Sequence, residues 1–190
     1  MPSPGHFRLR HLVAGLAVFV ADQWSKGRID RLPDDFNRVV IPGVFRLVHA
    51  ENPGVAFGLF QNAAPQFRDL LIGASSVALL VILVLLWRSQ QSSRTGYAMA
   101  LIAGGACGNL LDRVVHGKVV DFLLFYLGSH SFPVFNLADS AIVVGATLLV
   151  WEIIHDRSPR MGPSMAPAAT NVTIGATAAV KTEFPADLPS

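Results

Sequence analysis

The chain alternates between long apolar stretches and shorter polar segments, a pattern typical of a protein that crosses a membrane several times. A helix of about 20 predominantly apolar residues is long enough to span the hydrocarbon core. The stretch at 67–87 is the clearest, because it is almost uninterrupted from Leu70 to Trp87. In all, the pattern predicts four transmembrane helices, at about residues 9–24, 67–87, 96–115 and 135–154.

The first apolar stretch is short, and its basic flank with Arg8 and Arg10 also fits a cleavable signal peptide. Asp22 and Lys26 favour a retained helix, because opposite charges at i, i+4 spacing lie on one helical face and attract each other. A signal peptide has no use for such a pair at its end. An even number of spans would then place both termini on one side of the membrane.

The segments between the spans carry their own signals. Residues 27–66 contain short alternating runs broken by Pro42 and Gly43, which predict a small β-element on the membrane surface. Residues 116–134 predict a longer hairpin. After Asp156 the composition changes to Pro, Ala, Thr and Ser, which predicts a membrane domain at 1–157 followed by a disordered tail at 158–190.

Composition supports the membrane assignment. The 190 residues are 52% hydrophobic and only 15% charged, whereas soluble domains are about 25% charged. The net charge of +2 gives no support for nucleic-acid binding. The single cysteine, Cys107, excludes an intramolecular disulfide and a cysteine metal cluster, and we interpret it as a packing residue. His116 and His130 have no partner at ligand spacing, so no metal site is expected. The fold class is therefore an all-α integral membrane protein with a small β-element.

Every unusual polar group in or beside the spans is predicted to lie at one face of the membrane, whereas the opposite face holds ordinary loop residues. A charge inside the bilayer costs about 2.5–3.5 kcal/mol on insertion scales, so such residues usually serve a function. Their convergence marks a candidate site. The set comprises Asp22, Lys26, Asn52, Asn109, Asp112, Arg113, Asp121, Asn136 and Asp139.

Asp121 and Asp139 are the candidate reactive groups. The apolar neighbours of Asp121 are expected to raise its pKa, whereas Asp139 stands in the first turn of the last span, where the helix dipole stabilises a negative charge. Two acids in different environments can share a proton, as in aspartic hydrolases. By themselves they fit the proton relay of a small proton-coupled transporter equally well, although the half of the membrane nearer the termini is almost wholly apolar. A structural adaptor would leave both acids unexplained.

Spacing also predicts how some supporting groups pair. Asn109, Asp112 and Arg113 share one helical face. Asp112 and Arg113 can neutralise each other or pair with other helices, and we interpret them as a structural ion pair. Asp22 and Lys26 are interpreted as a supporting i, i+4 pair at the interface.

Five motifs together resemble one family. The match covers about residues 7–156, all five motifs occur in family order, and the family is that of the lipoprotein signal peptidases (signal peptidase II). The motifs are Asp22-Gln23-Trp24-Ser25-Lys26, Asn52-Pro53-Gly54-Val55-Ala56-Phe57, Gly108-Asn109-Leu110-Leu111-Asp112-Arg113, Gly117-Lys118-Val119-Val120-Asp121-Phe122 and Phe135-Asn136-Leu137-Ala138-Asp139.

The resemblance implies an aspartic endopeptidase of the bacterial inner membrane, with cytoplasmic termini and an active site at the periplasmic face. Lys and Arg are almost evenly divided between the two sides, so charge counting does not decide this orientation. The enzyme would remove signal peptides from prolipoproteins by cutting before the diacylglyceryl-modified lipobox cysteine, and residues 27–66 would form a periplasmic platform for the substrate.

The resemblance also implies residue roles and partners. Asp121 and Asp139 match the catalytic dyad, and no cofactor or metal is implied. Partners would be diacylglyceryl prolipoproteins, membrane lipid and globomycin-like cyclic peptide inhibitors, with the chain acting as a monomer. The supporting and substrate-binding positions would be Asp22, Lys26, Asn52, Gly54, Gly108, Asn109, Asp112, Arg113, Asn136 and Ala138.

Overall fold

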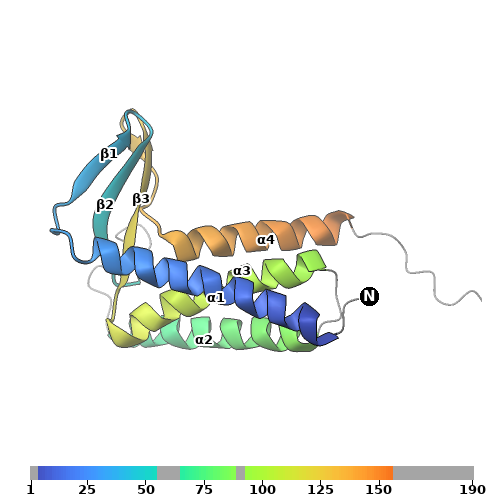
Figure 1. Ribbon diagram of the computed structural model, residues 1–190. Coiled ribbons are helices and arrows are strands. Elements are labelled where there is room, and N and C mark those ends of the chain that lie inside the picture. The colour runs from blue at the N-terminus through green and yellow to red at the C-terminus, as the bar shows by residue number, and fades with distance from the viewer. Residues whose placement is uncertain (1–3, 55–64, 89–92, 156–190) are drawn as a thin grey trace, which may run out of the picture. The chain divides into compact units, whose positions relative to one another are not determined.

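A computed structural model describes residues 4–54, 65–88 and 93–155, and the structural statements below concern these parts of the chain. The predicted tail at 158–190 lies outside them, so it stays a prediction. Figure 1 shows the helices side by side, with the sheet at the end where α1 finishes and α4 begins. The elements are α1 Pro4–Ile29, β1 Asn37–Ile41, β2 Phe45–Asn52, α2 Pro65–Arg88, α3 Ser93–Val115, β3 Val119–Leu127, β4 His130–Ser131 and α4 Leu137–His155.

The four helices coincide with the four predicted apolar stretches. Three segments are long and apolar enough to cross a membrane: Arg68–Arg88, Arg94–Val115 and Leu137–His155. The outward faces of the helices are apolar, as at Leu70 and Val77 of α2, which are 64% and 63% exposed. A membrane protein presents such a face to lipid. The span assigned to α1 remains a prediction.

Helix α3 lies at the centre and packs against α1, α2 and α4. Small residues permit the close approach of neighbouring backbones, which drives helix association in membranes. A Cβ atom at Gly104 would collide with the backbone of Gly15 in α1, and one at Gly105 would collide with the backbone carbonyl of Ala138 in α4. Gly104 and Gly105 therefore permit the close packing of α3 against α1 and α4.

The strands form one antiparallel sheet in the order β1-β2-β3-β4. The predicted β-element within 27–66 and the predicted hairpin within 116–134 are both present. The sequence pattern did not predict that these two segments join in one sheet: β3 pairs with β2 and brings Asp121 opposite Ala50. Such a pairing between distant strands leaves no local pattern in the sequence.

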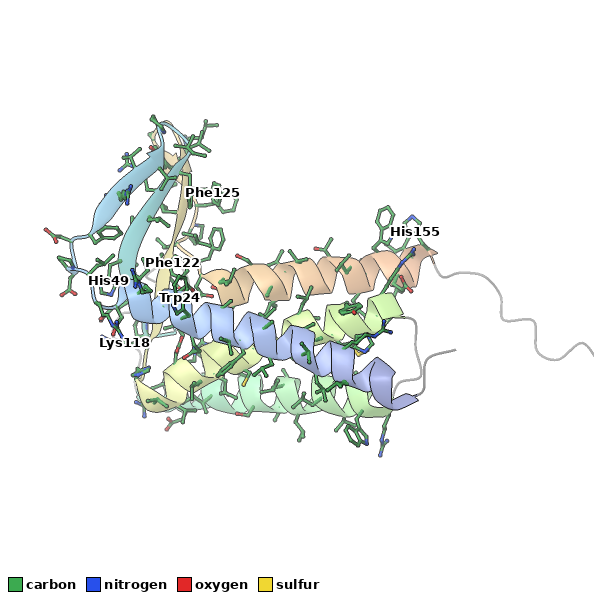
Figure 2. All side chains as sticks on the ribbon, in the orientation of Figure 1. Trp24, His49, Lys118, Phe122, Phe125 and His155 are labelled. Atoms are coloured by element: carbon green, nitrogen blue, oxygen red, sulfur yellow. The ribbon has the colours of Figure 1, made fainter. Side chains whose placement is uncertain are left out.

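The sheet is fixed to the helices by an apolar cluster, which also sets the direction of Asp121. Ile29 at the end of α1 packs with Val120 and Phe122 of β3, and Leu137 of α4 adds to the cluster. Side chains alternate between the faces of a strand. Because its two neighbours pack into the cluster, Asp121 points to the other face of β3. Figure 2 shows Phe122 at this junction, close to the α1 end of the sheet.

Candidate active site

Asp121 is a buried carboxyl with an amide donor on each oxygen. The residue is 3% exposed. Its Oδ2 accepts a hydrogen bond from Nδ2 of Asn52 at 3.0 Å, and its Oδ1 accepts one from Nδ2 of Asn136 at 2.7 Å. Asn52 lies at the end of β2 and Asn136 immediately before α4, so the sheet and the helices together orient this carboxyl.

Asp139 is held by the start of α4. Asn136 caps the helix: its Oδ1 accepts from the backbone N–H of Asp139 at 2.9 Å, and Oδ2 of Asp139 accepts from the backbone N–H of Asn136 at 3.3 Å. This reciprocal pair is a capping box, which satisfies two N–H groups that the first helical turn leaves unpaired. The second oxygen of Asp139 accepts from Nδ2 of Asn109 at 2.8 Å.

The two aspartates are joined through two asparagines. Asn136 donates from Nδ2 both to Asp121 and to Oδ1 of Asn109, the latter at 3.1 Å, while its backbone N–H donates to Asp139. Asn109 contributes its own Nδ2 to Asp139. The four side chains come from β3, α3 and the start of α4, and they form one continuous hydrogen-bond network.

Lys26 lies behind this network as a buried cation. Its Nζ lies 2.8 Å from Oδ2 of Asp22, 2.6 Å from Oδ2 of Asp112 and 2.8 Å from Oδ1 of Asn109. The side chains of Lys26 and Asp22 are 4% and 0% exposed. The structure confirms the Asp22–Lys26 pair and shows it buried inside the bundle.

The predicted ion pair between Asp112 and Arg113 is wrong. Asp112 pairs with Lys26, while Nη1 of Arg113 donates to the backbone carbonyl of Asn109 at 3.2 Å. Adjacent residues in a helix point in different directions, whereas residues on separate helices can meet face to face. Asp112 therefore has a partner on α1 that sequence spacing alone did not reveal.

Gln23 is a polar residue of this network that the sequence analysis did not single out. Its Nε2 donates to Oδ1 of Asp112 at 3.0 Å and also lies 3.3 Å from both Oδ2 of Asp22 and the carbonyl of Gly108. The remaining oxygen of Asp22 accepts from the backbone N–H of Ala138 at 2.9 Å. The only signal in the sequence was its position next to Asp22.

Three small residues at the site make room for these contacts. A Cβ atom at Gly108 would collide with the Asp22 carboxylate. Ala138 is fully buried where its N–H meets Asp22. Gly54 has φ +106°, a conformation that glycine adopts readily, and its N–H donates to Oδ1 of Asn52 at 2.9 Å. That turn fixes the amide that contacts Asp121. Residues 55–57 of the same motif lie outside the described parts.

The environment of Asp121 favours its protonated form. Burial raises the pKa of Asp121 to about 6, and the negative charge of Asp139 acts in the same direction, against the lowering effect of the hydrogen bonds from Asn52 and Asn136. The surroundings hold four carboxyls, at Asp22, Asp112, Asp121 and Asp139, and the basic groups of Lys26 and Arg113. The excess of acids is consistent with Asp121 keeping its proton up to about pH 6.

This shift predicts a pH dependence of stability. The pKa of Asp121 rises from 3.8 to about 6 on folding, so its stabilising contribution is fully present below about pH 4 and is lost as pH rises through 6. A shift of about two units corresponds to about 3 kcal/mol. We expect the free energy of unfolding of wild type, relative to Asp121→Asn, to fall by up to about this amount between pH 4 and 7. Parallel denaturation series in detergent measure the difference, and equal pH dependence in both proteins would contradict it.

The structure thus brings all the predicted polar site residues to one end of the bundle. The opposite half, expected to be almost wholly apolar, also contains a buried polar residue. His11 of α1 is fully buried there, with its ring edge against Tyr97 at 4.7 Å between ring centroids. It lies near the other end of α1, some ten residues from Asp22, outside the network described above.

Known proteins are similar to this chain in both sequence and fold. The family described as signal peptidase (SPase) II matches residues 14–155. The lipoprotein signal peptidase of Solibacter usitatus is 37% identical over 78% of this chain and 94% of its own length. That of Neisseria meningitidis is 41% identical over 83% of this chain and 97% of its own length.

Among solved structures, a bacterial membrane enzyme superposes with a TM-score of 0.70 at 25% identity, covering 80% of this chain and 91% of the other. A second one gives a TM-score of 0.69 at 26% identity. The sequence match spans α1 to α4 and includes both candidate aspartates. The chain therefore belongs to the signal peptidase II family, a family of aspartic-type membrane proteases.

Proposed function

We propose that the protein removes signal peptides from prolipoproteins, with Asp121 and Asp139 as the catalytic dyad. The observation that carries the proposal is their shared environment: two carboxyls from β3 and α4 bound to the same asparagine, Asn136. The family relationship supports the substrate, because the relatives named above are lipoprotein signal peptidases. Membership of a protease family also favours the protease over the proton-coupled transporter, a function that the two acids alone would equally fit.

The proposed mechanism uses one proton shared by the dyad. Asp139 is the ionised member and takes a proton from a water molecule placed between the two carboxyls. Asp121, which keeps its proton, donates a hydrogen bond to the scissile carbonyl. Water attacks to give a tetrahedral gem-diol, and a carboxyl then protonates the leaving amine. No covalent acyl-enzyme is needed.

The surrounding groups hold the dyad without taking part in proton transfer. Lys26 donates to Oδ1 of Asn109, which polarises that amide and strengthens the hydrogen bond from its Nδ2 to Asp139. Asn52 and Asn136 each donate to one oxygen of Asp121 and so fix the orientation of its carboxyl. Arg113 and the turn at Gly54 are candidates for contacts with the substrate backbone.

We further propose that all four helices span the inner membrane with cytoplasmic termini, which places the dyad at the periplasmic face. The described chain begins and ends at the same end of the bundle, as Figure 1 shows, and the site lies at the other end. The substrate's diacylglyceryl chains would then remain in the membrane while its peptide bond reaches the dyad. The enzyme would act as a monomer, and the cleavage reaction itself would use no metal or cofactor.

A cleavage assay with two matched substrates tests this function. The full chain in detergent should cut a diacylglyceryl-modified prolipoprotein immediately before the modified cysteine. The same precursor without the lipid should be cut far more slowly, and a globomycin-like cyclic peptide should inhibit. Equal cleavage of both precursors would show that the lipid does not determine substrate specificity. A cut elsewhere would refute the lipobox assignment.

A further inference from the structure

A second cluster of charged side chains lies beside the sheet, separate from the dyad network. A ring nitrogen of His49 and one carboxylate oxygen each from Asp30 and Glu51 lie within 4.8 Å of one another. His49 and Glu51 are two residues apart on β2, and Asp30 directly follows α1. His49 and Glu51, with Asp34, also line a hollow of about 190 Å³.

His49 supplies the observation that points to a ligand. Its side chain is only 3% exposed, and Nδ1 lies 3.2 Å from the backbone carbonyl of Leu32. A proton on Nδ1 satisfies that carbonyl and leaves Nε2 with a free lone pair. Nε2 is buried and has no hydrogen-bond partner in the described parts of the chain. Metal-binding histidines commonly have this arrangement, with one ring nitrogen donating to a carbonyl and the other free to bind.

We propose that Asp30, His49 and Glu51 bind a divalent first-row transition metal ion of the zinc class. One imidazole and two carboxylates suit Zn²⁺, whereas Mg²⁺ and Ca²⁺ prefer oxygen ligands alone. Zinc binds such atoms at about 2.0–2.1 Å, so ligand atoms on one ion lie about 3.3 Å apart. The side chains of Asp30 and Glu51 can close the remaining gap by rotating, because both residues are exposed at the surface.

Lys118 is the natural competitor for this site. Its Nζ pairs with Oε1 of Glu51, and the side chains of Lys118 and Glu51 are 39% and 44% exposed. The negative charges of Asp30 and Asp34 also act on it. Figure 2 shows Lys118 and His49 at the same end of the sheet. An ammonium occupies part of the position where a metal ion would bind, so its removal should tighten metal binding.

The site would tie the end of α1 to β2. Asn52, which donates to Asp121, stands three residues after His49 on the same strand. The proposed ion is not part of the proteolytic reaction, and its binding does not depend on the function of the dyad.

Zinc titration of the full-length protein tests the proposal, with any affinity tag removed and metal first stripped by a chelator. Wild type should retain one Zn²⁺ per chain after desalting, and bound Co²⁺ should give visible absorption bands. His49→Ala should weaken binding about a hundredfold, and Glu51→Gln about tenfold. Lys118→Met should strengthen it several-fold. Thermal unfolding with and without Zn²⁺ provides a second readout, because an ion that binds the folded state raises its melting temperature.

The matched control is His130→Ala, which removes an exposed histidine from β4 and should bind Zn²⁺ like wild type. Millimolar Mg²⁺ should not displace the zinc. Unchanged binding by His49→Ala, or no stoichiometric Zn²⁺ in wild type, would overturn the proposal. If His49→Ala does not fold, Glu51→Gln and Lys118→Met decide, because the proposal requires them to change affinity in opposite directions.

Discussion

Replacing either Asp121 or Asp139 by asparagine is expected to lower cleavage by about three orders of magnitude or more, since general acid–base catalysis by a positioned side chain contributes about 10²–10⁴-fold and both steps use the pair. An amide cannot accept the proton of the attacking water, and it cannot donate a carboxylic proton to the scissile carbonyl. The measurement is turnover of the lipid-modified precursor, together with thermal stability to show that each variant is folded.

Two controls separate loss of catalysis from loss of structure. Asp35→Asn removes an exposed carboxyl before β1 and should cleave at the wild-type rate. Cys107→Ala should also remain active, because the mechanism needs no thiol. Near-normal turnover by Asp121→Asn or Asp139→Asn would exclude that residue from the dyad, and an inactive but folded Cys107→Ala would revive a thiol mechanism.

Lys26→Met is expected to give the largest loss of stability. The substitution leaves Asp22 and Asp112 buried without their cation, and removing one member of a buried ion pair typically costs about 3–5 kcal/mol. Cleavage should fall as well, because Asn109 loses the hydrogen bond that holds it against Asp139. Thermal unfolding in detergent and turnover, measured on the same preparation, test the two effects.

A second substitution tests whether charge is the cause. Lys26→Met combined with Asp112→Asn removes one of the stranded carboxylates and should recover part of the lost stability, although not the activity. The sum of the two single effects is the reference for this comparison. If the loss in free energy of unfolding of the double variant equals the sum of the two single losses, the loss comes from packing around the lysine stem and not from the unpaired acids.

The revised role of Arg113 follows from the same network. Because Asp112 is paired to Lys26, loss of the Arg113 guanidinium leaves no unpaired acid, and Arg113→Ala is not expected to destabilise the protein through Asp112. Arg113 contacts only a helix carbonyl, that of Asn109, among the hydrogen bonds seen here. A substrate contact is therefore the more informative hypothesis for this residue.

Much of the architecture could be predicted from local pattern. Apolar length specified the helices to within a few residues at most ends, because a span must bury its backbone polar groups in helical hydrogen bonds wherever it lies in the fold. The convergence of the polar positions at the ends of those helices, from Asp22 to Asp139, could also be predicted, because the chain reverses direction at each loop. Asp121 and Asp139 could be singled out because burying an acid is costly.

The pairings between distant segments required the tertiary structure. Sequence spacing suggested Asp112 with Arg113, but an ion pair depends on which helices face each other, and α1 faces α3 here. The same limit hid the pairing of β3 with β2, which places Asp121 on a strand, and the meeting of Asp30 with His49 and Glu51. Periodicity reports which face of an element is apolar; which partner covers that face is decided by the packing of the whole chain.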